Sequence, residues 1–216
     1  MTARFTPERF HAADGVADWR VVFGGACACF VTESYADALA LLEAIGTMAD
    51  EAGEHLELDL RRSAVTVTVR SGALGALTEH DLTLAQRVSR IAHERGVNAD
   101  PSRVQTVQVA IDAHVPADVL PFWRAVLGYD AAGGEDLLDP RGRGPSLWFQ
   151  EMSPPRRGRN RLHIDVCVPP EQAKARIAAA VAAGGRVVYE ANAPAWWTLA
   201  DPEGNEVDVA TMMGRG

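Results

Sequence analysis

A histidine beside acidic residues opens the most suggestive stretch of the chain, GEHLELDLRRSAVTVTVR at residues 53–70. Its leucines alternate with polar residues, which predicts a strand that buries one face in a β-hairpin. His55 falls on the polar face, directly after Glu54. An imidazole and a carboxylate can both transfer protons near neutral pH. This polar face is therefore a candidate site for general acid–base chemistry.

A second group of polar and aromatic residues falls on the strands expected in the C-terminal half. We expect these side chains to line a ligand-binding cleft, and they include Trp148, Gln150 and Trp197. Trp197 follows Trp196, and neighbouring residues of a strand point to opposite faces. One of the two indoles should therefore face the cleft or a partner.

The composition limits the classes of partner. The chain has 216 residues, 47% of them apolar, and a net charge of -8, which indicates a globular protein and disfavours nucleic acid or an anionic membrane as partner. No apolar run approaches the roughly 20 residues that cross a bilayer. The N-terminus lacks the apolar core of a secretory signal. Three cysteines form no disulfide framework, so we expect a cytoplasmic location.

The elements that would position these residues form two groups. Residues 1–97 predict two strands, a helix opening at Ser34, the hairpin, and a second helix capped by Thr78. Two helices on one face of a four-stranded antiparallel sheet make an α+β layer. Residues 98–104 are rich in loop formers and predict a linker.

Residues 105–216 show a weak internal repeat. A strand at VQTVQVAIDAHVP precedes the helix ADVLPFWRAVLGY, and a strand at RLHIDVCVPP precedes the helix EQAKARIAAAVAAGG. Short strands follow each helix, which predicts paired βαβββ units with a cleft between them.

The first half resembles the pterin-4a-carbinolamine dehydratase family, on its element order, on Trp19 and on the 53–81 segment. That family carries three histidines there, and the resemblance places them at Glu54, His55 and Gly72. The family's threonine and aspartate correspond to Thr78 and Asp81. The resemblance implies catalytic roles for His55, Glu54 and Asp81, with dehydration activity weakened or altered, since Gly72 cannot transfer a proton. Asp81 is equally suited to capping a helix.

The second half resembles the glyoxalase-like domains of the vicinal oxygen chelate superfamily. The resemblance rests on VAIDAHVPADVLPFWRAVLGY, SLWFQEMSPPRRGRNRLHIDVCVP and LADPEGNEVDV. It implies a βαβββ pair that binds a small molecule. In metal-dependent relatives the ligands come from the first and last strands of each repeat, and the resemblance places these cleft-lining positions at Gln108, Trp148, His163 and Asp208. His163 and Asp208 are possible ligands for a divalent ion, but Trp148 cannot ligate a metal and Gln108 ligates poorly. Two protein ligands are normally too few to hold a catalytic ion, so we expect no metal and no other cofactor. The DPEGN segment is also a plausible hairpin turn on its own.

Three functions stay open at this point. The first is a hydro-lyase acting on a small hydroxylated heterocycle, with a glyoxalase-like ligand-binding domain. The second is a non-catalytic protein that sequesters a small molecule, as in drug resistance. The third is a dimerisation or interaction protein, because some relatives of the first domain serve as dimerisation partners. We expect a homodimer and a small-molecule ligand.

Overall fold

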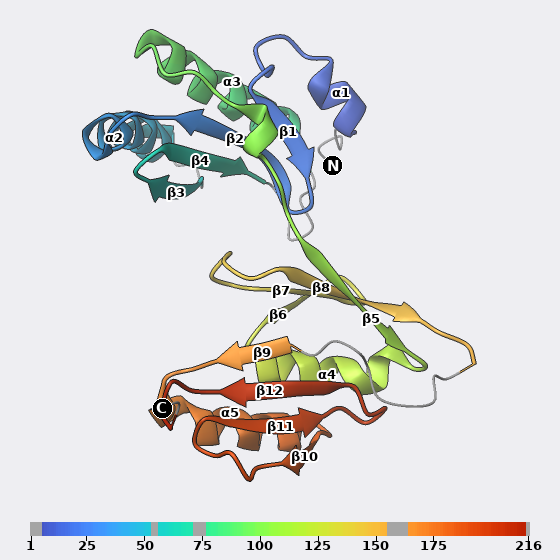
Figure 1. The fold of residues 1–216 in the computed structure, drawn as a ribbon. Coiled ribbons are helices and arrows are strands. Elements are labelled where there is room, and N and C mark those ends of the chain that lie inside the picture. The colour runs from blue at the N-terminus through green and yellow to red at the C-terminus, as the bar shows by residue number, and fades with distance from the viewer. Residues whose placement is uncertain (1–5, 53–55, 71–76, 155–163, 215–216) are drawn as a thin grey trace. The chain divides into compact units, whose positions relative to one another are not determined.

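The computed structural model describes residues 6–52, 56–70, 77–154 and 164–214. Two compact units divide the chain between Val107 and Gln108. Each unit combines helices with antiparallel or mixed sheets, so the expected α+β class is confirmed (Figure 1).

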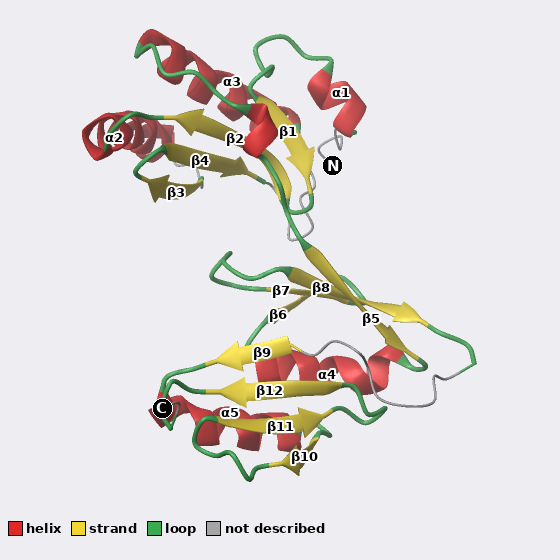
Figure 2. Cartoon of the chain, in the orientation of Figure 1, coloured by secondary structure: helices red, strands yellow, loops and turns green. Residues whose placement is uncertain are grey.

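The first unit has one antiparallel sheet with helices on one face (Figure 2). The sheet order is β1-β2-β4-β3. Its elements are α1 (Pro7–His11), β1 (Trp19–Val22), β2 (Gly25–Val31), α2 (Tyr35–Ala52), β3 (Glu57–Arg61), β4 (Ala64–Val69), α3 (Glu79–Glu94) and the 3₁₀ turn η1 (Pro101–Arg103). The short helix α1 and the turn η1 are additions to the elements expected from the sequence.

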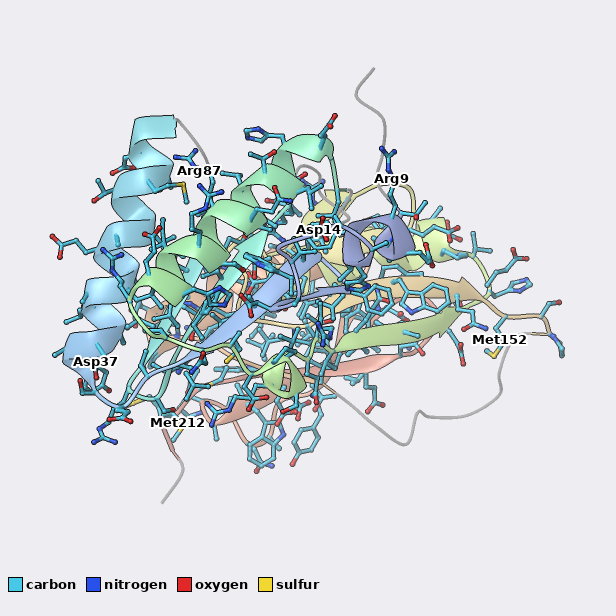
Figure 3. The ribbon with its side chains drawn as sticks, turned by 90° about the horizontal axis from the view of Figure 1, so that it is seen from above. Arg9, Asp14, Asp37, Arg87, Met152 and Met212 are labelled. Atoms are coloured by element: carbon cyan, nitrogen blue, oxygen red, sulfur yellow. The ribbon has the colours of Figure 1, made fainter. Side chains whose placement is uncertain are left out.

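Side chains alternate between the two faces of each strand, and those on the helix-covered face form the core of this unit. Val65, Val67 and Val69 of β4 are buried against apolar residues of α2 and α3. Trp19 is fully buried, and its Nε1 donates to Ser89 Oγ on α3 at 3.0 Å, which satisfies both polar groups. Charged side chains such as Asp37 on α2 and Arg9 on α1 are exposed (Figure 3).

The segment expected to be a linker belongs largely to the first unit. Val31 N donates to Asn98 O at 2.9 Å, and Asp100 N donates to Cys29 O at 2.8 Å. These bonds extend the β2 ladder and lead into η1. Residues 104–107 then lead from η1 to β5, and the two compact units divide between Val107 and Gln108.

The second unit contains the expected pair of βαβββ repeats. The first repeat is β5 (Gln108–Ala113), α4 (Pro116–Leu127), β6 (Asp130–Ala132), β7 (Asp136–Leu138) and β8 (Ser146–Glu151). The second is β9 (Ile164–Cys167), α5 (Pro170–Ala182), β10 (Arg186–Tyr189), β11 (Trp196–Ala200) and β12 (Glu206–Ala210). Their sheets have the orders β5-β8-β7-β6 and β10-β11-β12-β9, with β5–β8 and β9–β12 parallel.

A shared core joins the two repeats. It combines Phe122, Trp123 and Val126 of α4 with residues of both sheets, including Phe149 and Val209. Each sheet therefore has one face that packs against a helix and one face that does not. We call the second kind the helix-free face.

Candidate functional site

On the helix-free face of the first unit, polar and charged side chains pair with one another. Cys27, Thr68 and Glu57 lie side by side on β2, β4 and β3. Cys27 Sγ and Thr68 Oγ1 are 3.2 Å apart, and burial raises the pKa of the Cys27 thiol. Glu57 forms an ion pair with Arg70. The thiol is thus held in its neutral form, which is poorly nucleophilic.

The next positions on β3 show the same pattern. Arg61 Nε donates to Asp59 Oδ1 at 2.7 Å, and Arg61 Nη2 donates to Asp59 Oδ2 at 3.0 Å. Glu54 and His55, the residues on which acid–base chemistry was predicted, lie outside the described residues, as does Gly72. Their catalytic roles stay predictions.

Asp81 is placed at the start of α3, where it caps the helix. Its Oδ2 accepts from Thr78 N at 2.7 Å and from Thr78 Oγ1 at 2.8 Å, while Asp81 N lies 3.4 Å from Thr78 Oγ1. Only 2% of Asp81 is exposed. This reciprocal arrangement is a capping box. The capping role predicted for Asp81 is therefore observed, and its catalytic role stays a prediction.

Three of the expected ligand-binding residues share the helix-free face of the β5–β8 sheet. Gln108, Trp148 and Gln150 occupy it, whereas the alternating residues, such as Phe149, pack into the core. Trp148 is half-buried. The strand register therefore assembles an indole and two amides on one surface.

An aspartate that the sequence analysis missed completes this surface. Asp136 of β7 lies directly beside Trp148 across the strand pair, and desolvation raises the pKa of its carboxyl group. Among the described residues, no group donates a hydrogen bond to this carboxylate. A carboxyl with a raised pKa beside a half-buried indole can serve as a proton donor or acceptor near a bound molecule.

The second sheet carries a polar row on its own helix-free face. Asp165, Asp208, Thr198 and Tyr189 face one another across β9, β12, β11 and β10. Thr198 Oγ1 donates to Asp208 Oδ1 at 2.6 Å. Asp208 is thus on the expected kind of surface. Asp165 could have been found from the sequence, because residues two apart fall on the same side of a strand and a strand was expected at RLHIDVCVPP.

The paired tryptophans lie on opposite sides of β11. Trp197 packs against the apolar core, on the side of β11 that also buries Leu199. Trp196 lies on the helix-free side, opposite Ala210 of β12. Alternation separates the two indoles without saying which side is covered. The ligand-binding role of Trp197 stays a prediction, and Trp196 is a second aromatic candidate of this strand.

Gln108, Trp148 and Asp208, the described positions among those considered for a metal ion, supply at most one strong ligand. Asp208 is engaged by Thr198, and Trp148 and Gln108 supply no strong ligand. Throughout the described ranges, no group of three or more His, Cys, Asp or Glu side chains is arranged to hold a metal. His163, the other expected ligand, lies outside those ranges.

The DPEGN turn holds the second unit together through hydrogen bonds to buried groups and to the start of α4. Buried Asp201 accepts from Trp123 Nε1 at 3.0 Å and from Asn205 N at 2.9 Å. Glu203 accepts from the backbone N–H groups of His114 at 2.7 Å and Val115 at 2.7 Å, at the start of α4. A turn of the second repeat therefore caps the helix of the first.

The two units define a protein with an N-terminal helix-covered antiparallel sheet and a C-terminal βαβββ pair. Residues 4–91 match the family model for pterin 4 alpha carbinolamine dehydratase, and residues 108–210 match that for a glyoxalase-like domain. The chain thus carries a pterin-carbinolamine-dehydratase-like domain followed by a glyoxalase-like domain, as the sequence motifs indicated.

Individual proteins are similar to parts of this chain. A protein of Nocardia farcinica (strain IFM 10152), named for pterin-4-alpha-carbinolamine dehydratase, is 35% identical over 60 residues, which is 28% of this chain and 63% of the relative. A solved transcriptional coactivator/pterin dehydratase from Brucella melitensis is 22% identical, with 42% of this chain and 99% of that chain covered and a TM-score of 0.38. A glyoxalase/bleomycin resistance protein from Albidiferax ferrireducens T118 is 19% identical, with coverages of 48% and 95% and a TM-score of 0.38.

No helix in the described part of the chain has both the length and the apolar character needed to cross a membrane.

Proposed function

We propose that this chain acts on a small organic molecule that binds on the helix-free face of the β5–β8 sheet. The observation that carries the proposal is the pairing of Asp136 with Trp148. The indole offers a flat apolar surface, and the carboxyl group with its raised pKa offers a proton or a hydrogen bond. Gln108 and Gln150 on the same face can orient polar atoms of the ligand.

A screen of the full chain tests this proposal. Candidate metabolites, including reduced pterins, would be ranked by the shift they cause in melting temperature, and hits would be measured by calorimetry. We expect Trp148→Ala and Asp136→Asn to weaken binding by about tenfold or more each. Asp118→Asn is the matched control, because Asp118 is exposed on α4, which packs against the opposite face of this sheet. Equal affinity in all three variants would overturn the proposed location.

Dehydration of a pterin carbinolamine is the second candidate, favoured by the match of residues 4–91. We infer that this activity is weakened, because Gly72 stands where the family has an imidazole. Losing one positioned acid or base typically lowers a rate by about 10²–10⁴. The full chain should therefore dehydrate a 4a-hydroxytetrahydropterin slowly, and Gly72→His should restore part of the rate. A rate near that of an intact dehydratase, abolished by His55→Ala, would contradict this inference.

On this proposal the chain combines a ligand-binding domain with a dehydratase-like domain of weakened activity. If the ligand binds without turnover, the chain is a non-catalytic protein that sequesters a small molecule. The three free cysteines, Cys27, Cys29 and Cys167, support a reducing, cytoplasmic setting.

A further inference from the structure

On the helix-free face of the β5–β8 sheet, one row of four directly paired residues ends in a small side chain on each side. Across the strands the row runs Ala132, Asp136, Trp148 and Ala110. Ala110, which is paired with the tryptophan, is exposed. No long side chain of this row therefore reaches over the indole or the carboxyl group. Paired side chains of neighbouring strands begin about 5 Å apart, so one flat ring can contact both groups.

The polar groups of this face decide which hydrogen bonds a ligand must supply. Burial raises the pKa of the Asp136 carboxyl group, and no charged neighbour among the described residues contributes to that rise. The four strands of the sheet contain no Lys, Arg or His. A ligand with N–H donors therefore provides the hydrogen bonds that this carboxyl group accepts. A carboxylate or phosphate ligand, by contrast, meets no cation on these strands.

Two amide side chains lie on either side of the indole along the strand direction. Gln150 follows Trp148 by two residues on β8. On the parallel strand β5, Gln108 precedes by two residues the alanine that is paired with Trp148. Two residues of a strand span about 7 Å, which is close to the length of a two-ring heterocycle. Each amide offers both donors and an acceptor, so polar substituents at the two ends of a bound ring can be paired.

We propose that the ligand of this face is a flat nitrogen heterocycle with an amino group beside a ring nitrogen, an inference that rests on the binding site proposed above. The ring stacks on Trp148. Its amino group donates to one oxygen of Asp136, while the ring nitrogen shares a proton with the other oxygen. A carboxylate forms the same pair of parallel hydrogen bonds with a guanidinium group. Because an indole accepts any flat ring, Asp136 is the residue that selects the amino heterocycle.

Two probes that differ in one group test this class of ligand. 2-Aminobenzimidazole carries an amino group beside a ring nitrogen, and 2-methylbenzimidazole has the same shape without that donor. Titration calorimetry with the full chain should show about tenfold tighter binding of the amino compound, because it forms one more hydrogen bond to a carboxylate. Equal affinities for the two probes, or binding of neither probe, would overturn the proposed class.

Three variants separate the two contacts. Asp136→Leu should remove the preference for the amino compound, and a preference that survives would overturn the proposal. Trp148→Leu should weaken both probes and keep the preference. Asp118→Leu, on exposed α4, is the matched control and should bind both probes like the wild type. The preference is a ratio of two affinities of one protein, so partial misfolding of a variant does not imitate its loss.

The same variants distinguish failure of the ligand class from failure of the site. If the wild type binds both probes equally and Trp148→Leu weakens both, the site stands and only the class of ligand is wrong. If both probes bind Trp148→Leu and Asp136→Leu as tightly as the wild type, the proposed site is wrong as well.

Discussion

The helix-free face of the first unit and that of the β5–β8 sheet in the second unit differ in how their carboxylates are paired. In the first unit, Glu57 and Asp59 are held by Arg70 and Arg61. In the second, Asp136 stands beside an indole and has a raised pKa caused by desolvation. Carboxylates that are already paired contribute to structure, whereas a carboxyl left beside an aromatic surface is available to a ligand. The comparison favours the glyoxalase-like domain as the site of binding.

The largest expected effect on stability concerns Asp201, in the turn that joins β11 to β12. Asp201→Ala should lower the free energy of unfolding of that unit by about 3 kcal/mol, because the buried donors Trp123 Nε1 and Asn205 N lose their acceptor. Urea unfolding followed by tryptophan fluorescence measures the change. The exposed Asp130→Ala should change it by less than about 0.5 kcal/mol. Similar values for the two variants would show that the turn does not hold this unit together.

The next effect concerns the capping box of the first unit. Asp81→Ala should lower the unfolding free energy by about 1–2 kcal/mol, because the backbone N–H and the hydroxyl of the N-cap residue Thr78 lose their acceptor and the capping box is broken. Circular dichroism during thermal unfolding measures it. Asp37→Ala on the exposed start of α2 is the matched control and should cost less. If Asp81→Ala leaves stability unchanged but abolishes dehydration, the aspartate acts in catalysis and not as a cap.

A smaller effect on stability is expected from the ion pair between Glu57 and Arg70. Glu57→Gln removes the ion pair with Arg70, in which both side chains are partly exposed, so the loss should be under about 1 kcal/mol. Raising the salt concentration should reduce the difference between wild type and variant, since salt screens exposed pairs. A loss that is insensitive to salt would mean that Glu57 acts through packing.

The smallest effect should have the opposite sign. The raised pKa of Asp136 means that its ionised form is disfavoured in the folded protein, so ionisation costs stability as pH rises through that pKa. Asp136→Asn should therefore stabilise the second unit at neutral pH, by no more than about 0.5 kcal/mol. The gain should vanish in acid, where the wild-type carboxyl is protonated. Unfolding at several pH values measures this, and destabilisation at neutral pH would contradict it.

Local sequence signals predicted much of this fold. The Thr78–Asp81 spacing predicted a capping box that the structure shows, and the repeated strand–helix pattern predicted both βαβββ units. Long-range contacts were beyond such signals. The bonds of Asn98 and Asp100 with β2 join residues about 70 apart, so loop-like composition suggested a linker where the chain is tied down.

The candidate site was predicted less well than the fold. Gln108, Trp148 and Gln150 were placed together because alternation along their strands is regular. Trp197 was chosen over Trp196 because alternation fixes relative, not absolute, orientation. Asp136 was missed since its strand has three residues, too few to show a period.

The cap that Glu203 provides for α4 has a consequence for how this unit is made. Its bonds span 88 and 89 residues of sequence, and contacts of such long range slow folding. During synthesis the first repeat leaves the ribosome well before the turn that completes it. Until Glu203 arrives, the N–H groups of His114 and Val115 lack this acceptor. The glyoxalase-like domain therefore matures as a whole, only after its second repeat has been translated.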